Sequence, residues 1–279
     1  MSGDLRSERK NVILAVKDLP TLPKALEEVT RLVEDPASST EQIAKVISRD
    51  LVLSAKVLKM VNSPIYGFPG RIGSVNHALV MLGYNVIKGI IVSTSVFDLM
   101  AQSMAGLWEH SVACATACRV VAQTAGFKDP EEYSVAGLLH DLGKVVWAVQ
   151  LPELKNQADR AVADRDLTFL EAEREVLGFG HDMVNLWLAN HWHLPLTTKE
   201  GMSHHHKPLG AEHHPQFACV VHLGDFLARL FEQGSGGDDN VPALSKDALK
   251  ALKLGTREID AILDQLADSL VEVAGLSFA

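Results

Sequence analysis

Apolar residues recur along this chain at the three- and four-residue spacing of an α-helix, and no segment alternates with the two-residue period of a β-strand. Residues 25–33 and 259–271 show the helical spacing most clearly. Ser39 and Gln42 stand at the two positions of a capping box, which marks a helix start. Gly83 interrupts an apolar segment and predicts a break between two helices. The pattern predicts an all-α protein built as a multi-helix bundle.

The composition indicates a soluble globular chain with an acidic excess. The 279 residues are 47% hydrophobic and 22% charged, and they carry a formal net charge of −9. This length allows one large domain or two modest ones with a substantial core. No run of lysine and arginine appears, so we expect no nucleic-acid partner, because binding to a phosphate backbone needs a basic stripe or excess.

The N-terminus, the apolar segments and the cysteines give expectations about compartment. Residues 1–10 are polar and lack the apolar centre of a signal peptide. Polar side chains interrupt the apolar residues 87–100, so we expect no membrane span. Three cysteines do not suggest a disulfide framework. We therefore expect a reducing, cytoplasmic setting.

A polar pair stands at the end of an apolar segment. His140 and Asp141 follow residues 133–139, within the sequence GLLHDLGK at residues 137–144. Neighbouring side chains on a helix point about 100° apart, so this imidazole and carboxylate can lean toward one cavity. The carboxylate can bridge two cations while the imidazole binds one. The pair is a candidate metal site, and a surface or capping pair is the alternative interpretation.

A second candidate lies in the predicted helix 108–123. His110, Cys114 and Cys118 recur there every four residues and share one face. A zinc site with these ligands is conceivable. Consecutive groups on such a face are about 6 Å apart, however, and three of them do not easily close a tetrahedron. We favour the interpretation that the two cysteines pack in the core.

The sequence GLLHDLGK resembles the signature of the HD superfamily of metal-dependent phosphohydrolases. Two earlier segments, DLVLSAKVLKMVNSPIYG at 50–67 and IGSVNHALVMLG at 72–83, resemble the HDOD domain, an HD-related output domain of bacterial signalling proteins. The two resemblances together cover about residues 19–229. They imply an N-terminal helical HDOD subdomain, residues 1–105, packed against an HD-like metal-binding subdomain, residues 106–279.

The HD resemblance implies metal ligands on several helices in a fixed order. That order is a histidine, the His-Asp pair, one or more further histidines and an aspartate. Within the cluster His204–His206, the resemblance favours His205 and His206, with Pro208 after them. The implied ligands are His110, His140, Asp141, His181, His205, His206 and Asp225. A set of this size suits two divalent ions that share Asp141.

The ligand types narrow the choice of metal, and the resemblance implies catalytic roles. Imidazole and carboxylate together suit iron, manganese, zinc or nickel better than calcium or magnesium. With this many imidazoles we expect iron, with manganese or zinc next. The HD resemblance implies that Lys144, one turn beyond His140, faces a phosphate. Asp141, Lys144 and Asp225 are therefore the expected catalytic residues, the two aspartates orienting the attacking water.

The expected activity is hydrolysis of a phosphoester, with a nucleotide or other phosphorylated small molecule as substrate. The HD-GYP enzymes, which hydrolyse cyclic dinucleotides, carry a Gly-Tyr-Pro motif that residues 207–217 lack, and Gly106 stands where some of them have a glutamate. The alternatives are a non-catalytic module with a structural or redox-sensing metal and a signalling protein as partner, and the di-iron oxygen chemistry of some HD relatives. An open metal face with Lys144 pointing inward would favour hydrolysis. A site plugged by the first hundred residues would favour sensing.

Overall fold

The computed structural model describes residues 2–14, 24–35 and 37–276. Within these ranges the chain forms α-helices, one short 3-10 helix and connecting loops, without a β-strand, which confirms the all-α prediction. The two prolines in residues 19–23 predict an extended entry to the first bundle helix, and that segment lies outside the described residues.

Most of the described helices follow one another through short connections, and the segments 62–74 and 231–245 are longer. In chain order they are α1 (Ser2–Leu14), α2 (Lys24–Glu34), α3 (Thr40–Ser48), α4 (Leu51–Val61), α5 (Val75–Ser103), α6 (Leu107–Thr124), α7 (Pro130–Leu139), α8 (Leu142–Gln150), α9 (Pro152–Arg165), α10 (Phe169–Leu177), α11 (His181–His191), α12 (Leu196–His204), the 3-10 helix η1 (Pro208–Gly210), α13 (Pro215–Leu230), α14 (Lys246–Ala251) and α15 (Thr256–Val273).

The helix boundaries follow the signals in the sequence. The Ser39 side chain accepts a hydrogen bond from the backbone N–H of Gln42, and the Gln42 side chain accepts one from the backbone N–H of Ser39. This is the predicted capping box of α3. Gly83 has φ 73° and ψ 169°, a conformation that L-residues avoid, and it kinks the long helix α5 where the break was predicted.

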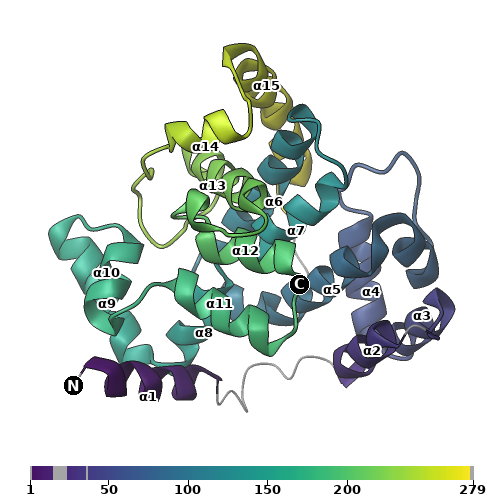
Figure 1. Ribbon diagram of the computed structural model, residues 1–279, viewed down its shortest axis with the longest axis horizontal. Helices are drawn as coiled ribbons and strands as arrows, with labels where there is room; N and C mark the ends of the chain where they lie inside the picture. The colour runs from purple at the N-terminus through teal and green to yellow at the C-terminus, as the bar shows by residue number, and fades with distance from the viewer. Residues whose placement is uncertain (1, 15–23, 36, 277–279) are drawn as a thin grey trace.

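Three helices, α6, α7 and α13, pack together at the centre of the molecule (Figure 1), and His110 and Asp225 of the candidate site lie on two of them. Helix α6 packs against both α7 and α13, and its Cys114 and Cys118 side chains are fully buried with their sulfurs 4.0 Å apart. A Cβ at Gly137 of α7 or Gly224 of α13 would lie 2.6 or 2.5 Å from the Cys118 sulfur. Small residues therefore allow the three helices to approach closely.

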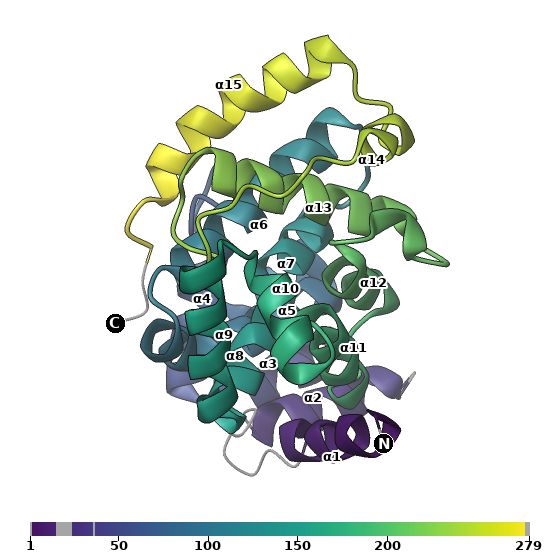
Figure 2. The same ribbon diagram turned by 90° about the vertical axis from the view of Figure 1, so that its left-hand side faces the viewer.

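The remaining helices surround this centre. Helices α2, α3 and α4 lie on one side, packed with α5, and helices α9 and α10 lie on the opposite side (Figure 1). Helix α15 crosses one end of the molecule (Figures 1 and 2). Buried apolar side chains from residues 1–105 and from residues 106–279 belong to one continuous hydrophobic cluster. The segment between α13 and α14 leaves this framework and reaches toward α10 (Figure 2).

Helix α5 is more apolar than the sequence analysis allowed. Among the described residues, Val75–Phe97 is the one helical segment long and apolar enough to cross a bilayer by length and composition, with Lys88 as its single charged side chain. In the fold, 61% of its most apolar window is buried inside the protein. Contacts with α3, α4 and α7 account for much of that burial, because they place protein on several sides of α5.

Candidate metal centre

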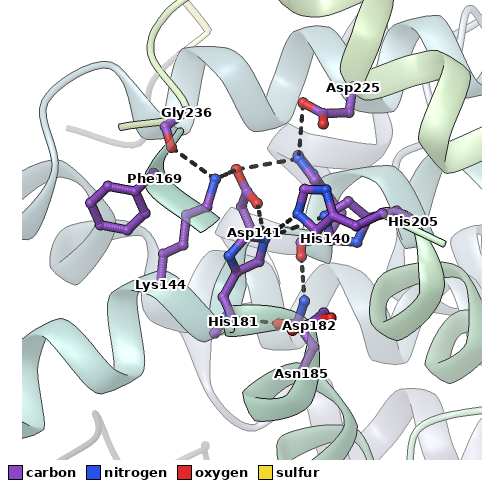
Figure 3. A network of polar contacts seen from close by, with 12 residues as sticks. His140, Asp141, Lys144, Phe169, His181, Asp182, Asn185, His205, Asp225 and Gly236 are labelled. Atoms are coloured by element: carbon purple, nitrogen blue, oxygen red, sulfur yellow. Dashed lines mark hydrogen bonds and ion pairs between the residues drawn. The ribbon is translucent and has the colours of Figure 1, made fainter. Parts of the chain in front are cut away.

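The seven predicted ligands converge on one position, although they come from distant parts of the chain. Figure 3 shows five of them, His140, Asp141, His181, His205 and Asp225. The His110 Nε2 atom lies 3.1 Å from Asp225 Oδ1 and 3.7 Å from Asp141 Oδ2. The His181 Nε2 atom lies 3.2 Å from Asp141 Oδ1 and 2.9 Å from His206 Nε2. The structure therefore brings these side chains within a few ångströms of one another.

His140 and Asp141 occupy the junction of two helices. The sequence suggested two neighbouring positions on one helix, but α7 ends at Leu139 and α8 begins at Leu142. His140 is the C-cap of α7, and Asp141, with φ −103° and ψ 6°, is the N-cap of α8. The turn between the helices therefore directs both side chains into the centre. His140 Nε2 lies 3.3 Å from Asp141 Oδ2.

Asn185 holds this junction in place. The Asn185 amide donates to the backbone carbonyls of His140 and of Met202, the latter at 2.8 Å, and its oxygen accepts from the backbone N–H of Gly143 at 2.7 Å. A Cβ at Gly143 would lie 2.5 Å from the His181 carbonyl oxygen. The Asn185 hydrogen bonds thus connect α8, α11 and α12 around the site, and the absence of a side chain at Gly143 allows α8 and α11 to approach closely.

Three of the imidazoles are oriented by acceptors on their outer nitrogen. The Nδ1 atoms of His140 and His205 lie 2.7 and 2.9 Å from the carbonyl oxygens of Gly137 and Met202. The Nδ1 atom of His181 lies 2.6 Å from Glu173 Oε2. An acceptor at Nδ1 holds the proton there, so each Nε2 presents a lone pair to the centre.

The inward-facing polar atoms fit a divalent cation. His110 Nε2, His140 Nε2 and Asp141 Oδ1 are buried and make no hydrogen bond of good geometry, although carboxylate or imidazole atoms lie 3.1–3.3 Å from each of them. Buried polar atoms normally have partners, so a group of such atoms that face one another fits a cation as their shared partner. Candidate ligand atoms lie within 4.8 Å of one another in three overlapping groups: His181, His205 and His206; His110, His140 and Asp225; and His140, Asp141 and His205. Described residues could therefore hold a metal here.

Asp141 stands between two sets of ligands. Its Oδ2 atom faces His110 and His140, and its Oδ1 atom faces His181. This is the position that a carboxylate needs to bridge two ions. The cysteines on α6 are not part of these groups. Their burial in the core favours the packing interpretation over a site made by His110, Cys114 and Cys118.

The electrostatics favour cation binding. Burial opposes the ionisation of Asp141, but the charges of His140 and Lys144 hold its pKa well below the usual value. Burial also opposes the ionisation of Asp225, and the Arg229 charge holds its pKa low. Burial lowers the pKa values of His205 and His206 well below the usual range. Burial disfavours the charged forms of His140 and His181, but Asp141 and Glu173 raise the pKa values of these two imidazoles. Because ionised carboxylates and neutral imidazoles are the forms that bind metals, a bound cation would replace the protons at these two positions.

The remaining histidines of the cluster region lie outside the ligand set. The His204 Nδ1 atom lies 3.0 Å from Ser203 Oγ. The His222 Nδ1 atom lies 2.8 Å from the carbonyl oxygen of His205, and its Nε2 accepts from the backbone N–H of Ser245 at 3.0 Å. His222 therefore supports the backbone of His205.

Lys144 points into the centre, and both of its polar contacts are within the protein. Its Nζ donates to Asp141 Oδ2 at 2.7 Å and to the carbonyl oxygen of Gly236 at 2.8 Å (Figure 3). A cavity of ≈80 Å³ lies beside it, with His181, His206 and Arg229 in its walls. Residues of the segment 233–242 form one side of this cavity and contact Lys144.

The sequence analysis did not single out four residues that shape this site. They are Glu173, Asn185, Arg229 and Asp238. Arg229 had a usable signal, because an acid and a base four residues apart on a helix can pair, and its Nε lies 3.1 Å from Asp225 Oδ1. Glu173 lies in a charged helix that resembles a solvated surface, and its complete burial had no signal in the sequence.

Comparison with known proteins identifies a domain and two curated relatives. The HDOD domain profile matches residues 19–208. An uncharacterized protein of Treponema pallidum is 25% identical over 223 residues, covering 78% of this chain and 43% of the relative. The uncharacterized protein YuxH of Bacillus subtilis is 27% identical over 129 residues, covering 45% and 32%. The chain thus spans less than half the length of the curated relatives it matches.

Solved structures share the fold over nearly the whole chain. An HDOD domain protein of unknown function from Geobacter sulfurreducens is 25% identical, with a TM-score of 0.71 and coverage of 98% of this chain and 97% of that one. A protein from Shewanella amazonensis named "Putative phosphohydrolase" is 23% identical, with a TM-score of 0.65 and coverage of 95% and 94%. At this identity, the second likeness concerns the fold alone.

Proposed function

Because this chain belongs to the HDOD family, we propose that it is a signal-transduction protein with a dinuclear metal site that hydrolyses phosphoesters. The observation that carries the proposal is the group of buried imidazole and carboxylate atoms that face one another around Asp141. The ligand types favour iron, with manganese or zinc as alternatives. We propose a phosphorylated small molecule or nucleotide as substrate, and a cytoplasmic setting in keeping with three unpaired cysteines.

The proposed roles follow from the positions of the side chains. Divalent ions held by these ligands would supply a Lewis acid for a phosphoryl oxygen and lower the pKa of a water molecule. Asp141 and Asp225 would orient the attacking water, since both carboxylates face the centre. Lys144 would neutralise charge that develops on the phosphoryl group. Its Nζ already lies in the centre, within 2.7 Å of Asp141.

A second candidate function is a sensing module that acts on a signalling protein without turnover. The observation that favours it is the closed state of the site, where Lys144 is fully engaged and the neighbouring cavity measures only ≈80 Å³. The cover comes from residues 233–242 and not from the first hundred residues. A cover of that origin is not the plug from the first hundred residues that was expected for a structural or sensing role, so the hydrolase stays the first candidate.

Metal analysis combined with turnover tests the proposal. Purified protein should contain up to two equivalents of a transition metal and hydrolyse phosphodiester or phosphomonoester substrates. His140→Ala should lose metal and turnover together. His204→Ala is the matched control, because this neighbouring histidine bonds to Ser203 outside the ligand groups, and it should keep both. Metal without turnover would replace the hydrolase proposal with the sensing one, and a protein that binds no metal would contradict both.

A further inference from the structure

Residues 233–242 form a strap over the metal centre, and its contacts use the two cations beside the site. Lys144 Nζ donates to the carbonyl oxygen of Gly236 at 2.8 Å. Arg229 Nη1 donates to Asp238 Oδ1 and to the carbonyl oxygen of Asn240, both at 3.0 Å. The cationic groups best placed to meet a phosphoryl group are therefore occupied by oxygen atoms of the chain itself.

The strap is built to lie close to its neighbours. A Cβ at Gly236 would collide with the Arg229 guanidinium, and a Cβ at Gly234 would collide with the backbone of Gly106 and His110. The backbone N–H of Ser235 donates to the Gly106 carbonyl oxygen at 3.0 Å. The sequence analysis noted Gly106 only because some HD-GYP enzymes have a glutamate there. In the structure, its lack of a side chain leaves room for the strap at the start of α6.

Asp238 fastens the far end of the strap. One carboxylate oxygen pairs with Arg229, and the other accepts from the backbone N–H of Phe169 at the start of α10, at 2.8 Å. The side chains of Asp238 and Arg229 are only 4% and 10% exposed. A shielded ion pair of this kind is worth more than one on the surface, so the strap is held shut at this point.

The strap borders two hollows. The inner cavity, of ≈80 Å³, touches Lys144, His181 and His206, and the outer hollow, of ≈300 Å³, is lined mainly by the strap itself. Arg229 and Asp238 are in the walls of both. The inner volume is about that of two or three water molecules, and the cations that a phosphoryl group would contact there are already bonded to the strap. Sites for drug-sized molecules occupy about 300–1,000 Å³, so a nucleotide would fit only with the strap displaced.

We propose that the strap competes with phosphoryl ligands for the site. The Gly236 carbonyl and the Asp238 carboxylate hold the positions on Lys144 and Arg229 that a phosphoryl ligand would take. This inference rests on the proposed function, because it names the group that the site accepts. Binding of a phosphoryl group releases the strap and joins the two hollows. The closed strap in turn weakens the binding of phosphoryl ligands, because a ligand must first displace it.

Inorganic phosphate and two strap variants test the inference in the full-length, metal-loaded protein. Asp238→Asn keeps an oxygen for the Phe169 N–H but removes the charge that faces Arg229. Gly236→Ala acts by a different route, because its methyl group would push the strap off the guanidinium. The control is Asp239→Asn, which removes the same charge from the same strap at a side chain without these contacts.

Both strap variants should bind phosphate about tenfold more tightly than the wild type, the equivalent of losing one charged hydrogen bond from the closed state. Asp239→Asn should match the wild type within about twofold. Calorimetry measures the affinity. In wild-type protein, phosphate should also speed amide exchange in residues 233–242, measured by mass spectrometry. Equal affinities in all four proteins, or exchange that phosphate leaves unchanged, would overturn the inference.

Failure of this inference differs from failure of the proposed function. If the protein holds metal and hydrolyses phosphoesters, but phosphate does not change amide exchange in the strap, the strap inference is refuted and the hydrolase proposal stands. A protein that does not turn over, but releases its strap on binding phosphate, supports the strap as a sensor of phosphoryl ligands. Absence of phosphate binding in the wild type and in both variants contradicts the strap inference directly.

Discussion

Glu173 is the test case for how a buried carboxylate prepares the metal centre. Its Oε2 accepts from the backbone N–H of His181 at 2.8 Å and faces the imidazole Nδ1 at 2.6 Å, while its Oε1 accepts from Trp147 Nε1 at 2.7 Å. In Glu173→Gln, one oxygen and one NH₂ group replace two acceptors. At least one N–H group then faces another N–H, in a place with no access to water.

The expected losses follow from these contacts. A buried donor left without an acceptor costs about 1–3 kcal/mol, and a charged hydrogen bond is worth about 1.5–3 kcal/mol. Glu173→Gln should therefore lower the free energy of unfolding by about 2–3 kcal/mol. Loss of an outer carboxylate from a metal-bound imidazole typically weakens metal affinity about 10–100-fold. We expect a loss in this range, because His181 would no longer be held with its Nε2 lone pair facing inward.

Metal competition titrations and urea unfolding measure the two effects. Glu175→Gln is the matched control on the same helix, because Glu175 is 52% exposed and pairs with Arg165 at the surface. It should change stability by at most about 0.5 kcal/mol. Trp147→Phe removes the other partner of Glu173 and should lower stability without a comparable loss of metal affinity. If Glu173→Gln kept its metal affinity within about twofold of the wild type, the assignment of Glu173 as a positioning residue would be wrong.

Three further predictions concern other parts of the site and its frame. Gly143→Ala should destabilise the protein by about 1–3 kcal/mol, because the new methyl carbon would lie 2.5 Å from the His181 carbonyl oxygen; thermal unfolding measures this, and an unchanged Tm would refute it. Removal of bound metal by a chelator should lower stability by about 3 kcal/mol when the free metal had stood at 100 times its Kd; identical melting curves with and without chelator would contradict a metal that binds the folded state. Glu200→Gln should cost about 1.5–3 kcal/mol at neutral pH, because backbone N–H groups at 213–214 donate to this carboxylate and, although burial opposes it, hold its pKa below the usual value. A lowered folded-state pKa stabilises the protein above the unfolded pKa, and this contribution is lost as the pH falls through the folded-state pKa, so denaturant melts of wild type and variant should converge in acid; a gap that persists there would refute the explanation.

The helical frame could be predicted from local signals alone. Ser39 with Gln42 and the kink at Gly83 act within a few residues, so the sequence carries the information directly. The junction at His140 and Asp141 was less predictable. Its geometry depends on Asn185, which lies more than 40 residues further along the chain and reaches back to the His140 carbonyl.

The covering parts of the site could not be predicted, for a physical reason. Asp238 lies in a Gly- and Asp-rich segment whose composition is typical of a mobile loop. Its ordered position comes from contacts with Arg229 and Phe169, which belong to two other helices. Such contacts form only after the helices have packed. A reading based on spacing within the chain therefore does not detect them.

Hydrogen bonds to main-chain carbonyl oxygens fix the orientation of two imidazoles of the site. His140 and His205 are each held by a carbonyl three residues earlier in the chain, those of Gly137 and Met202. Every residue type supplies that oxygen, so the anchoring tolerates mutational drift at position 202 as long as the helix still ends there. His181 depends instead on one particular carboxylate. Substitutions near His205 should therefore disturb the orientation of its imidazole less than substitutions near His181 disturb that of His181.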